Sequence, residues 1–182
     1  TRLGISTTLV DFTDMQAVEA AIKPNTKVLF CETPVNPHLQ VFDLSQMASI
    51  AKAHNLVSIV DNTFMTPLLQ QPLALGIDMV IHSATKYLNG HGDVIAGIVC
   101  GNAEHMHRLK FEILKDFGGV ISPHDAWLIL RGLKTLDVRL TRHCDNAEVL
   151  AEYLDTHPKF SQVFYPGLAH HQGHRFVGKQ MK

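Results

Sequence analysis

The chain has 182 residues, a formal net charge of −1, 46% hydrophobic residues and 18% charged residues. This length predicts one compact domain or two small ones, and this composition excludes an intrinsically disordered chain. The near-neutral charge balance argues against nucleic acid or an anionic membrane as a partner, and the longest apolar runs are too short to span a bilayer.

The first half of the chain alternates short apolar runs with segments of helical periodicity. We expect helices at 15–23, 43–54 and 68–75, and strands at 27–32, 57–60, 79–81 and 95–100. Such alternation is typical of α/β proteins, in which helices flank a mostly parallel sheet and bury both of its faces.

The second half predicts helices at 103–117, 124–133 and 138–156. A serine at position 122, a proline at 123 and an acid at 125 are typical of a helix N-terminus. Ser122, His124 and Asp125 lie too close in sequence to face one another as a hydrolase triad, so we interpret them as part of a helix cap.

Three widely spaced cysteines occur without a C-x-x-C motif. They predict buried, reduced thiols and neither a disulfide framework nor a zinc site. The opening residues Thr1–Ile5 lack a basic stretch followed by an apolar core, so we expect no secretory signal and a cytoplasmic location. The cysteines are Cys31, Cys100 and Cys144.

Three of the twelve histidines cluster near the end of the sequence, at positions 170, 171 and 174. No carboxylate or cysteine accompanies them in the sequence pattern, and a metal site needs several ligands at fixed geometry. We therefore interpret them as surface histidines and expect no bound metal.

Polar side chains follow three of the predicted strands. Glu32 and the loop that ends in Asn36 stand at the end of the first strand, Asp61 follows the second, and Ser83, Thr85 and Lys86 follow the third. Ligands of open parallel sheets bind beyond the carboxyl ends of the strands, so we expect these residues to meet at one site.

These residue types match the chemical needs of pyridoxal phosphate. Desolvation lowers the pKa of an amine, so a partly buried Lys86 can attack a carbonyl. The Ser83 and Thr85 hydroxyls can bind a phosphate, and Asp61 can hold a proton on a ring nitrogen. Spacing alone leaves open the alternatives of a surface lysine, a turn-forming aspartate and hydroxyls bonded to their own backbone.

Five motifs extend this pattern along the chain: ETPVNP at 32–37, VDNTF at 60–64, HSATKYLNGHGD at 82–93, SPHD at 122–125 and LRGLKTL at 130–136. With them the sequence resembles the Cys/Met metabolism family of pyridoxal-phosphate enzymes. The resemblance implies the large cofactor-binding domain of a fold-type I, aspartate-aminotransferase-like enzyme, with pyridoxal 5'-phosphate as cofactor.

The resemblance also implies a role for each matching residue. Lys86 corresponds to the catalytic Schiff-base lysine and Asp61 to the partner of the pyridine nitrogen. Ser83 and Thr85 correspond to the phosphate-binding hydroxyls, and Asn36 to the asparagine that contacts the ring hydroxyl of the cofactor.

Family members are longer than this chain. We therefore expect residues 1–182 to be the central and C-terminal part of the large domain, without the N-terminal segment and the C-terminal small domain. Such a piece is expected to be inactive by itself. In the family the enzyme is typically a homotetramer, a dimer of dimers, that acts on a small sulfur-containing amino acid.

The pair Lys115–Asp116 resembles the corresponding pair of methionine γ-lyases. It implies γ-elimination of L-methionine to 2-oxobutanoate, methanethiol and ammonia. Three alternatives stay open: a cystathionine γ-lyase, a γ-replacement enzyme such as cystathionine γ-synthase or O-acetylhomoserine sulfhydrylase, and a structural fragment without catalytic competence.

Overall fold

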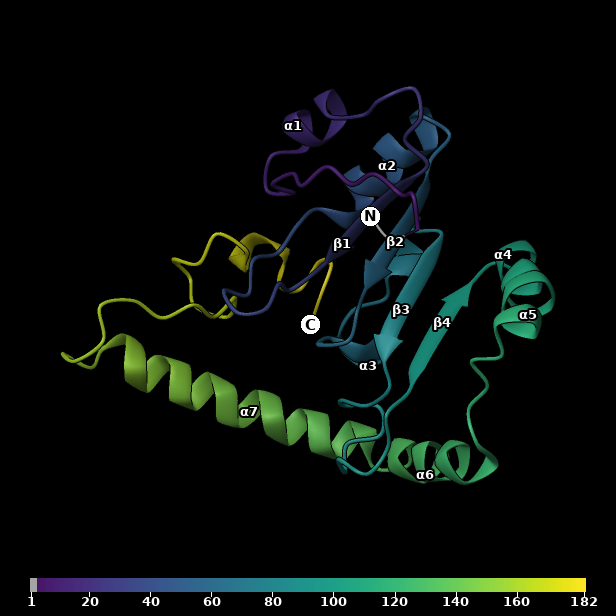
Figure 1. Ribbon diagram of the computed structural model, residues 1–182. Helices are drawn as coiled ribbons and strands as arrows, with labels where there is room; N and C mark the ends of the chain where they lie inside the picture. The colour runs from purple at the N-terminus through teal and green to yellow at the C-terminus, as the bar shows by residue number, and fades with distance from the viewer. Residues whose placement is uncertain (1–2) are drawn as a thin grey trace.

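The computed structural model describes residues 3–182 and contains a four-stranded sheet in the order β1-β2-β3-β4 (Figure 1). Strands β1 (Val28–Glu32), β2 (Val57–Asp61) and β3 (Met79–Ser83) are parallel, whereas β4 (Gly97–Gly101) runs antiparallel to β3. The predicted α/β architecture with a mostly parallel sheet is confirmed. The last strand reverses because no helix connects it to β3, and a parallel neighbour would need a crossover connection.

Helices α1 (Met15–Ala20) and α2 (Leu44–Ala53) pack together on one face of the sheet. Each begins with an aspartate whose carboxylate accepts backbone N–H groups of the first turn. The apolar residues of α2 recur at helical spacing and therefore form one buried stripe. The core between helices and strands includes Leu29, Cys31, Leu44, Met47, Ile50, Val60 and Val80.

The opposite face of the sheet is more open among the described residues, so the expectation that helices bury both faces is wrong for this face. Val28 and Phe30 alternate with the buried Leu29 and Cys31 of β1, and their exposed fractions are 44% and 53%. Because strand side chains alternate between faces, each strand contributes one set of residues to the core and another to this open face.

The prediction of one continuous helix at 68–75 is wrong, because two short helical elements occupy this region. These are α3 (Thr66–Leu69) and the 3₁₀ helix η1 (Pro72–Leu75). Between them the backbone of Gln70 is extended. The buried Gln70 amide donates to the Thr33 carbonyl at 3.1 Å and to Asn62 Oδ1 at 2.8 Å. These tertiary hydrogen bonds, together with Pro72, outweigh the local helical periodicity.

A chain of side-chain amides continues from Gln70 to the end of the sequence. Asn62 Nδ2 donates to the Gln70 carbonyl at 2.9 Å, and Gln180 Nε2 donates to Gln70 Oε1 at 3.0 Å. Gln180 also donates to the Phe42 carbonyl and accepts the Leu44 N–H at the start of α2. The C-terminal stretch is thereby fixed to the start of α2 and to Gln70.

The second half of the chain is helical, as predicted. Helix α4 (Ala103–Arg108), the π-helical segment η2 (Leu109–Leu114) and α5 (Lys115–Phe117) follow one another beside β4 (Figure 1). Helix α6 (Pro123–Leu133) and the long α7 (Leu136–Asp155) lie beyond the end of the sheet toward which β3 points. None of the helices within 3–182 is long and apolar enough to cross a membrane.

The cysteines differ from one another in burial. Cys31 is buried, and burial together with the charge of Glu32 raises the pKa of its thiol to about 12. This side chain is a core thiol, as predicted. Cys100 is exposed because it lies on the edge strand β4, so the expectation of burial is wrong for this residue, and Cys144 is half-buried.

The C-terminal histidines also differ. His171 is buried, contrary to the surface prediction, and its Nδ1 accepts the Gly173 N–H at 3.0 Å. Burial lowers the pKa of this imidazole. His174, in the 3₁₀ helix η3 (His174–Phe176), lies 2.9 Å from the Pro166 carbonyl, whereas His170 lies 3.5 Å from Asp155.

Candidate functional site

The predicted site residues lie at the carboxyl ends of the parallel strands. Strand register aligns Glu32 with Asp61, and Asp61 with Ile81. Ser83 follows Ile81 by two residues, so its side chain lies on the same side of the sheet as the two carboxylates. The open face thus carries Glu32, Asp61 and Ser83 side by side on three neighbouring strands.

Backbone hydrogen bonds fix the orientation of Asp61. Its Oδ1 accepts the N–H of Thr63 at 2.9 Å. The hydroxyl of Thr63 accepts in turn the N–H of Ser83 at 2.7 Å, which connects the ends of β2 and β3. Thr63 is a site residue that the sequence interpretation missed. Its position two residues after a strand-end aspartate was the available signal.

Glu32 forms a pair of carboxylates with Asp61. Burial and the neighbouring charge of Asp61 raise the pKa of Glu32, while a hydrogen bond from the backbone N–H of Asn36 acts in the opposite direction. Two adjacent carboxylates on a half-buried surface repel each other and attract a cation. This arrangement suits a protonated ring nitrogen.

Asn36 lies in the exposed loop after β1. Its backbone hydrogen bond to the Glu32 side chain links this loop to the carboxylate pair. The structure therefore brings Asn36 to the same end of the sheet as Asp61.

The two hydroxyl residues after β3 differ in their hydrogen bonds. Thr85 Oγ1 accepts the N–H of Ala96 at 3.0 Å and lies 3.3 Å from the Ala96 carbonyl. The Ser83 hydroxyl has no protein partner within the described residues. Ser83 is thus available for a ligand oxygen, whereas Thr85 also holds β4 beside β3.

Lys86 lies in a tight turn directly after β3. Its N–H donates to the Ser83 carbonyl at 3.1 Å, and its own carbonyl accepts the Gly90 N–H at 2.7 Å. The residue is exposed, so the expectation of a partly desolvated lysine is wrong for the described chain. The amine is accessible to a reacting carbonyl.

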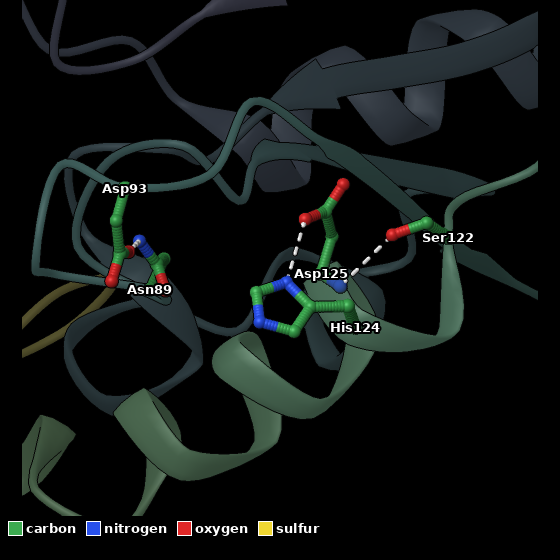
Figure 2. Close-up of polar contacts among 5 residues, drawn as sticks. All are labelled: Asn89, Asp93, Ser122, His124 and Asp125. Carbon is green, nitrogen blue, oxygen red and sulfur yellow. Dashed lines mark hydrogen bonds and ion pairs between the residues drawn. The ribbon is translucent and has the colours of Figure 1, made fainter.

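The cap interpretation of Ser122 is confirmed. In Figure 2, Ser122 Oγ accepts the backbone N–H of Asp125 rather than facing His124. The donor–acceptor distance is 3.0 Å. His124 Nδ1 lies 3.6 Å from Asp125 Oδ1 on the surface of the same helix. These residues stabilise the start of α6 and do not form a hydrolase triad.

Comparison with known proteins identifies the family. The sequence model of the family described as "Cys/Met metabolism PLP-dependent enzyme" matches residues 1–182. The chain belongs to this family.

Several members are closely similar to the chain. The L-methionine gamma-lyase of Fusobacterium nucleatum subsp. polymorphum is 50% identical over 184 residues, which cover 100% of the chain and 47% of that protein. A cystathionine beta-lyase of Lactococcus lactis subsp. cremoris is 48% identical over 181 residues, or 100% of the chain and 48% of that protein.

A solved structure agrees with the fold. The cystathionine gamma-lyase from Lactobacillus plantarum, complexed with L-serine, has a TM-score of 0.96 and 41% identity over 100% of the chain and 48% of that structure. The chain therefore spans about half the length of the relatives that it matches.

The site residues of this Cys/Met metabolism family member suit the family's cofactor, pyridoxal phosphate. The carboxylate pair can face a cationic ring nitrogen, the free Ser83 hydroxyl can bind a phosphate oxygen, and the exposed Lys86 amine can condense with an aldehyde. The described residues contain no cluster of three or more histidine, cysteine or acidic side chains that could hold a metal ion.

Proposed function

We propose that the whole protein is a pyridoxal-phosphate-dependent carbon–sulfur lyase that acts on a sulfur-containing amino acid. One observation carries the proposal: the Glu32–Asp61 carboxylate pair, the free Ser83 hydroxyl and the exposed Lys86 amine lie at the same end of the sheet. Close relatives named as lyases support it.

Each site residue receives a role in this proposal. Lys86 would bind the cofactor aldehyde covalently, and Asp61 would hold the ring nitrogen. Ser83 and Thr85 would bind the phosphate, the latter while it keeps the Ala96 N–H. The side chain of Asn36 would contact the ring hydroxyl from the loop after β1.

The bound cofactor supplies an electron-withdrawing ring that stabilises negative charge at the substrate α-carbon. Asp61 keeps a proton on the ring nitrogen, and the neighbouring Glu32 adds negative potential at the same place. Once free, the Lys86 amine would act as the base that moves protons at the α-carbon and the β-carbon of the substrate, and it would give up the first proton before it takes the second. The proton from the β-carbon would leave with the γ-substituent as a thiol, and addition of water would release a 2-oxo acid and ammonia.

We infer methionine as the preferred substrate. The Lys115–Asp116 pair and the relatives named L-methionine gamma-lyase support this choice. Cystathionine is the second candidate, favoured by the cystathionine beta-lyase relative and the cystathionine gamma-lyase structure. With methionine as the only substrate, release of methanethiol and 2-oxobutanoate supports the first assignment, whereas turnover of cystathionine alone supports the second.

We also propose that residues 1–182 form the central and C-terminal part of the large domain of a homotetramer. Large apolar side chains on the helical half are exposed in the single chain, among them Phe111, Phe117, Trp127 and Leu130. Contiguous exposed apolar surface is typical of subunit interfaces. Light scattering on the full-length protein tests the assembly, and a monomer would contradict it.

Replacement of Lys86 tests the central proposal. In the full-length protein, Lys86→Ala should abolish the visible absorbance of the lysine-bound cofactor and the turnover of methionine. Lys52→Ala, at an exposed position of α2, is the matched control and should leave both unchanged. Normal absorbance and turnover in Lys86→Ala would overturn the assignment.

A further inference from the structure

The turn that carries Lys86 packs between the sheet and the two C-terminal helices. Ala84 and Leu88 are buried in a cluster with Ile129 of α6 and Leu136 of α7. Lys86 lies midway between the two buried residues and is exposed. Since residues four apart lie on one side of a helical turn, the amine leaves on the side opposite the packed surface.

One guanidinium joins this turn to both helices. Arg139 Nη1 donates to the Tyr87 carbonyl at 3.0 Å, and its Nη2 donates to the Gly132 carbonyl at 3.0 Å. The Nε of the same side chain lies 3.1 Å from Thr135 Oγ1. The planar fork of arginine can reach these three acceptors at once, which a lysine ammonium on its flexible stem does not reproduce.

A second contact holds the same residue of the turn. The ring of Tyr87 packs edge-on against His143, with 5.7 Å between the ring centroids and 68° between the planes. His143 follows Arg139 by four residues, so both project from one side of α7. The residue next to Lys86 is thus held by α7 through its carbonyl and through its ring.

Two glycines allow this close approach. A Cβ at Gly90 would overlap the guanidinium of Arg139, and a Cβ at Gly132 would overlap the Asn89 carbonyl. Gly90 also has a φ of +78°, a conformation that favours glycine. The backbone of the turn is therefore in direct contact with the end of α6 and with the Arg139 side chain.

We propose that Arg139 is a positioning residue for Lys86. By holding the Tyr87 carbonyl, it fixes the backbone of the lysine turn so that the amine projects toward the strand-end site. Its positive charge lies at the carbonyl end of the turn, where a cation is electrostatically favourable. This inference rests on the proposed role of Lys86 but concerns the turn itself, which exists without cofactor.

Amide hydrogen exchange of the cofactor-free, full-length protein tests whether Arg139 holds the turn that carries Lys86. The reporters are the N–H groups of Asn89 and Gly90, which donate to the carbonyls of Ala84 and Lys86. Arg139→Met should accelerate their exchange by about tenfold, because a charge-assisted hydrogen bond is lost. Arg139→Lys should recover part of the protection, while Arg142→Met, at an exposed position of the same helix, should match wild type.

In the cofactor-loaded protein, cofactor affinity and visible circular dichroism can be measured on the folded state, so a general loss of stability does not change them. Arg139→Met should weaken pyridoxal phosphate binding by about tenfold and reduce the visible circular dichroism of the bound cofactor, with the far-ultraviolet spectrum unchanged. In both measurements Arg139→Lys should lie between Arg139→Met and wild type. If Arg139→Met does not fold, Arg139→Lys alone is used for the test.

The outcomes separate the two proposals. If Lys86→Ala retains the visible band, the proposed function is wrong whatever Arg139 does. If Lys86 is required but the Arg139 variants match Arg142→Met in exchange, binding and dichroism, the positioning role is wrong. Loss of exchange protection with unchanged binding and dichroism would also overturn it, because Arg139 would then be purely structural.

Discussion

The two faces of the sheet differ in what their side chains do, although the same strands supply both. The helix-covered face carries Leu29, Val60 and Val80, which pack on α1 and α2. The open face carries Glu32, Asp61 and Ser83, which the register brings side by side. Residues adjacent in sequence thus have different roles. A substitution on the helix-covered face should affect stability, whereas a substitution on the open face should affect ligand binding.

The largest effect is expected in the core of the covered face. Met47 is fully buried in α2, so Met47→Ala should lower the free energy of unfolding by about 2–5 kcal/mol through lost burial and a residual cavity. Denaturant unfolding measures the change. The position of the visible cofactor band in the folded variant should stay as in wild type, and a shifted band would show that the two faces are coupled.

Asp61→Asn, on the open face, should weaken cofactor binding and leave the fold intact, which is the opposite of the result expected for Met47→Ala. The amide oxygen can still accept the Thr63 N–H, so the fold should persist. The lost negative charge should weaken pyridoxal phosphate binding by about tenfold or more, since ion-paired hydrogen bonds are the stronger class. Titration followed by absorbance measures the affinity. Equal affinity in the variant would mean that the ring nitrogen lies elsewhere.

Glu32→Gln should change the pH dependence of stability. The folded-state pKa of Glu32 is raised, mainly by burial and then by Asp61, so the folded chain binds the proton more tightly than the unfolded chain. The contribution of Glu32 to wild-type stability should therefore fall as pH rises from the ordinary value of 4.5 through the raised pKa. The glutamine does not titrate and can still accept the Asn36 N–H.

The variant should consequently gain stability relative to wild type between acidic and neutral pH. Denaturant unfolding at pH below 4.5 and at neutral pH measures this difference. A difference that is the same at both pH values would contradict the raised pKa of Glu32.

The smallest effect is expected at Phe30. Its side chain is 53% exposed on the open face of the single chain, so Phe30→Ser should change the free energy of unfolding by only about 0.5 kcal/mol. The comparison with Met47→Ala is informative because both residues are large and apolar. A loss at Phe30 as large as that at Met47 would show that another part of the full-length protein covers this face.

Periodicity predicted the strands and helices of the chain closely, since buried strands are short apolar runs and the helices repeat apolar residues on one side. The direction of β4 and the break at Gln70 were not predictable, because they depend on a connection without a helix and on hydrogen bonds to Thr33 and Asn62. Local patterns do not encode such tertiary partners.

For the site, the strand-end rule brought Asp61 and Ser83 together correctly. Sequence reasoning did not give Thr63 its linking role or Arg139 its place beside the lysine turn. Arg139 is 53 positions from Lys86 in sequence. It binds the backbone carbonyl of Tyr87, the residue after Lys86, and a backbone carbonyl leaves no mark in the sequence. The exposure of Lys86 was also missed, because burial of a turn depends on which segments pack over it.

The amides of Gln70 and Gln180 have a directional order. Each carboxamide has one oxygen end and one nitrogen end, so flipping either group would bring two like ends together. The order of donors and acceptors therefore fixes the orientation of Gln180 against Gln70. Because the last link ends on the Thr33 carbonyl, loss of the Gln180 amide would weaken a hydrogen-bond chain that reaches the start of the loop carrying Asn36. A substitution near the C-terminal stretch would thus act on a loop beside the site.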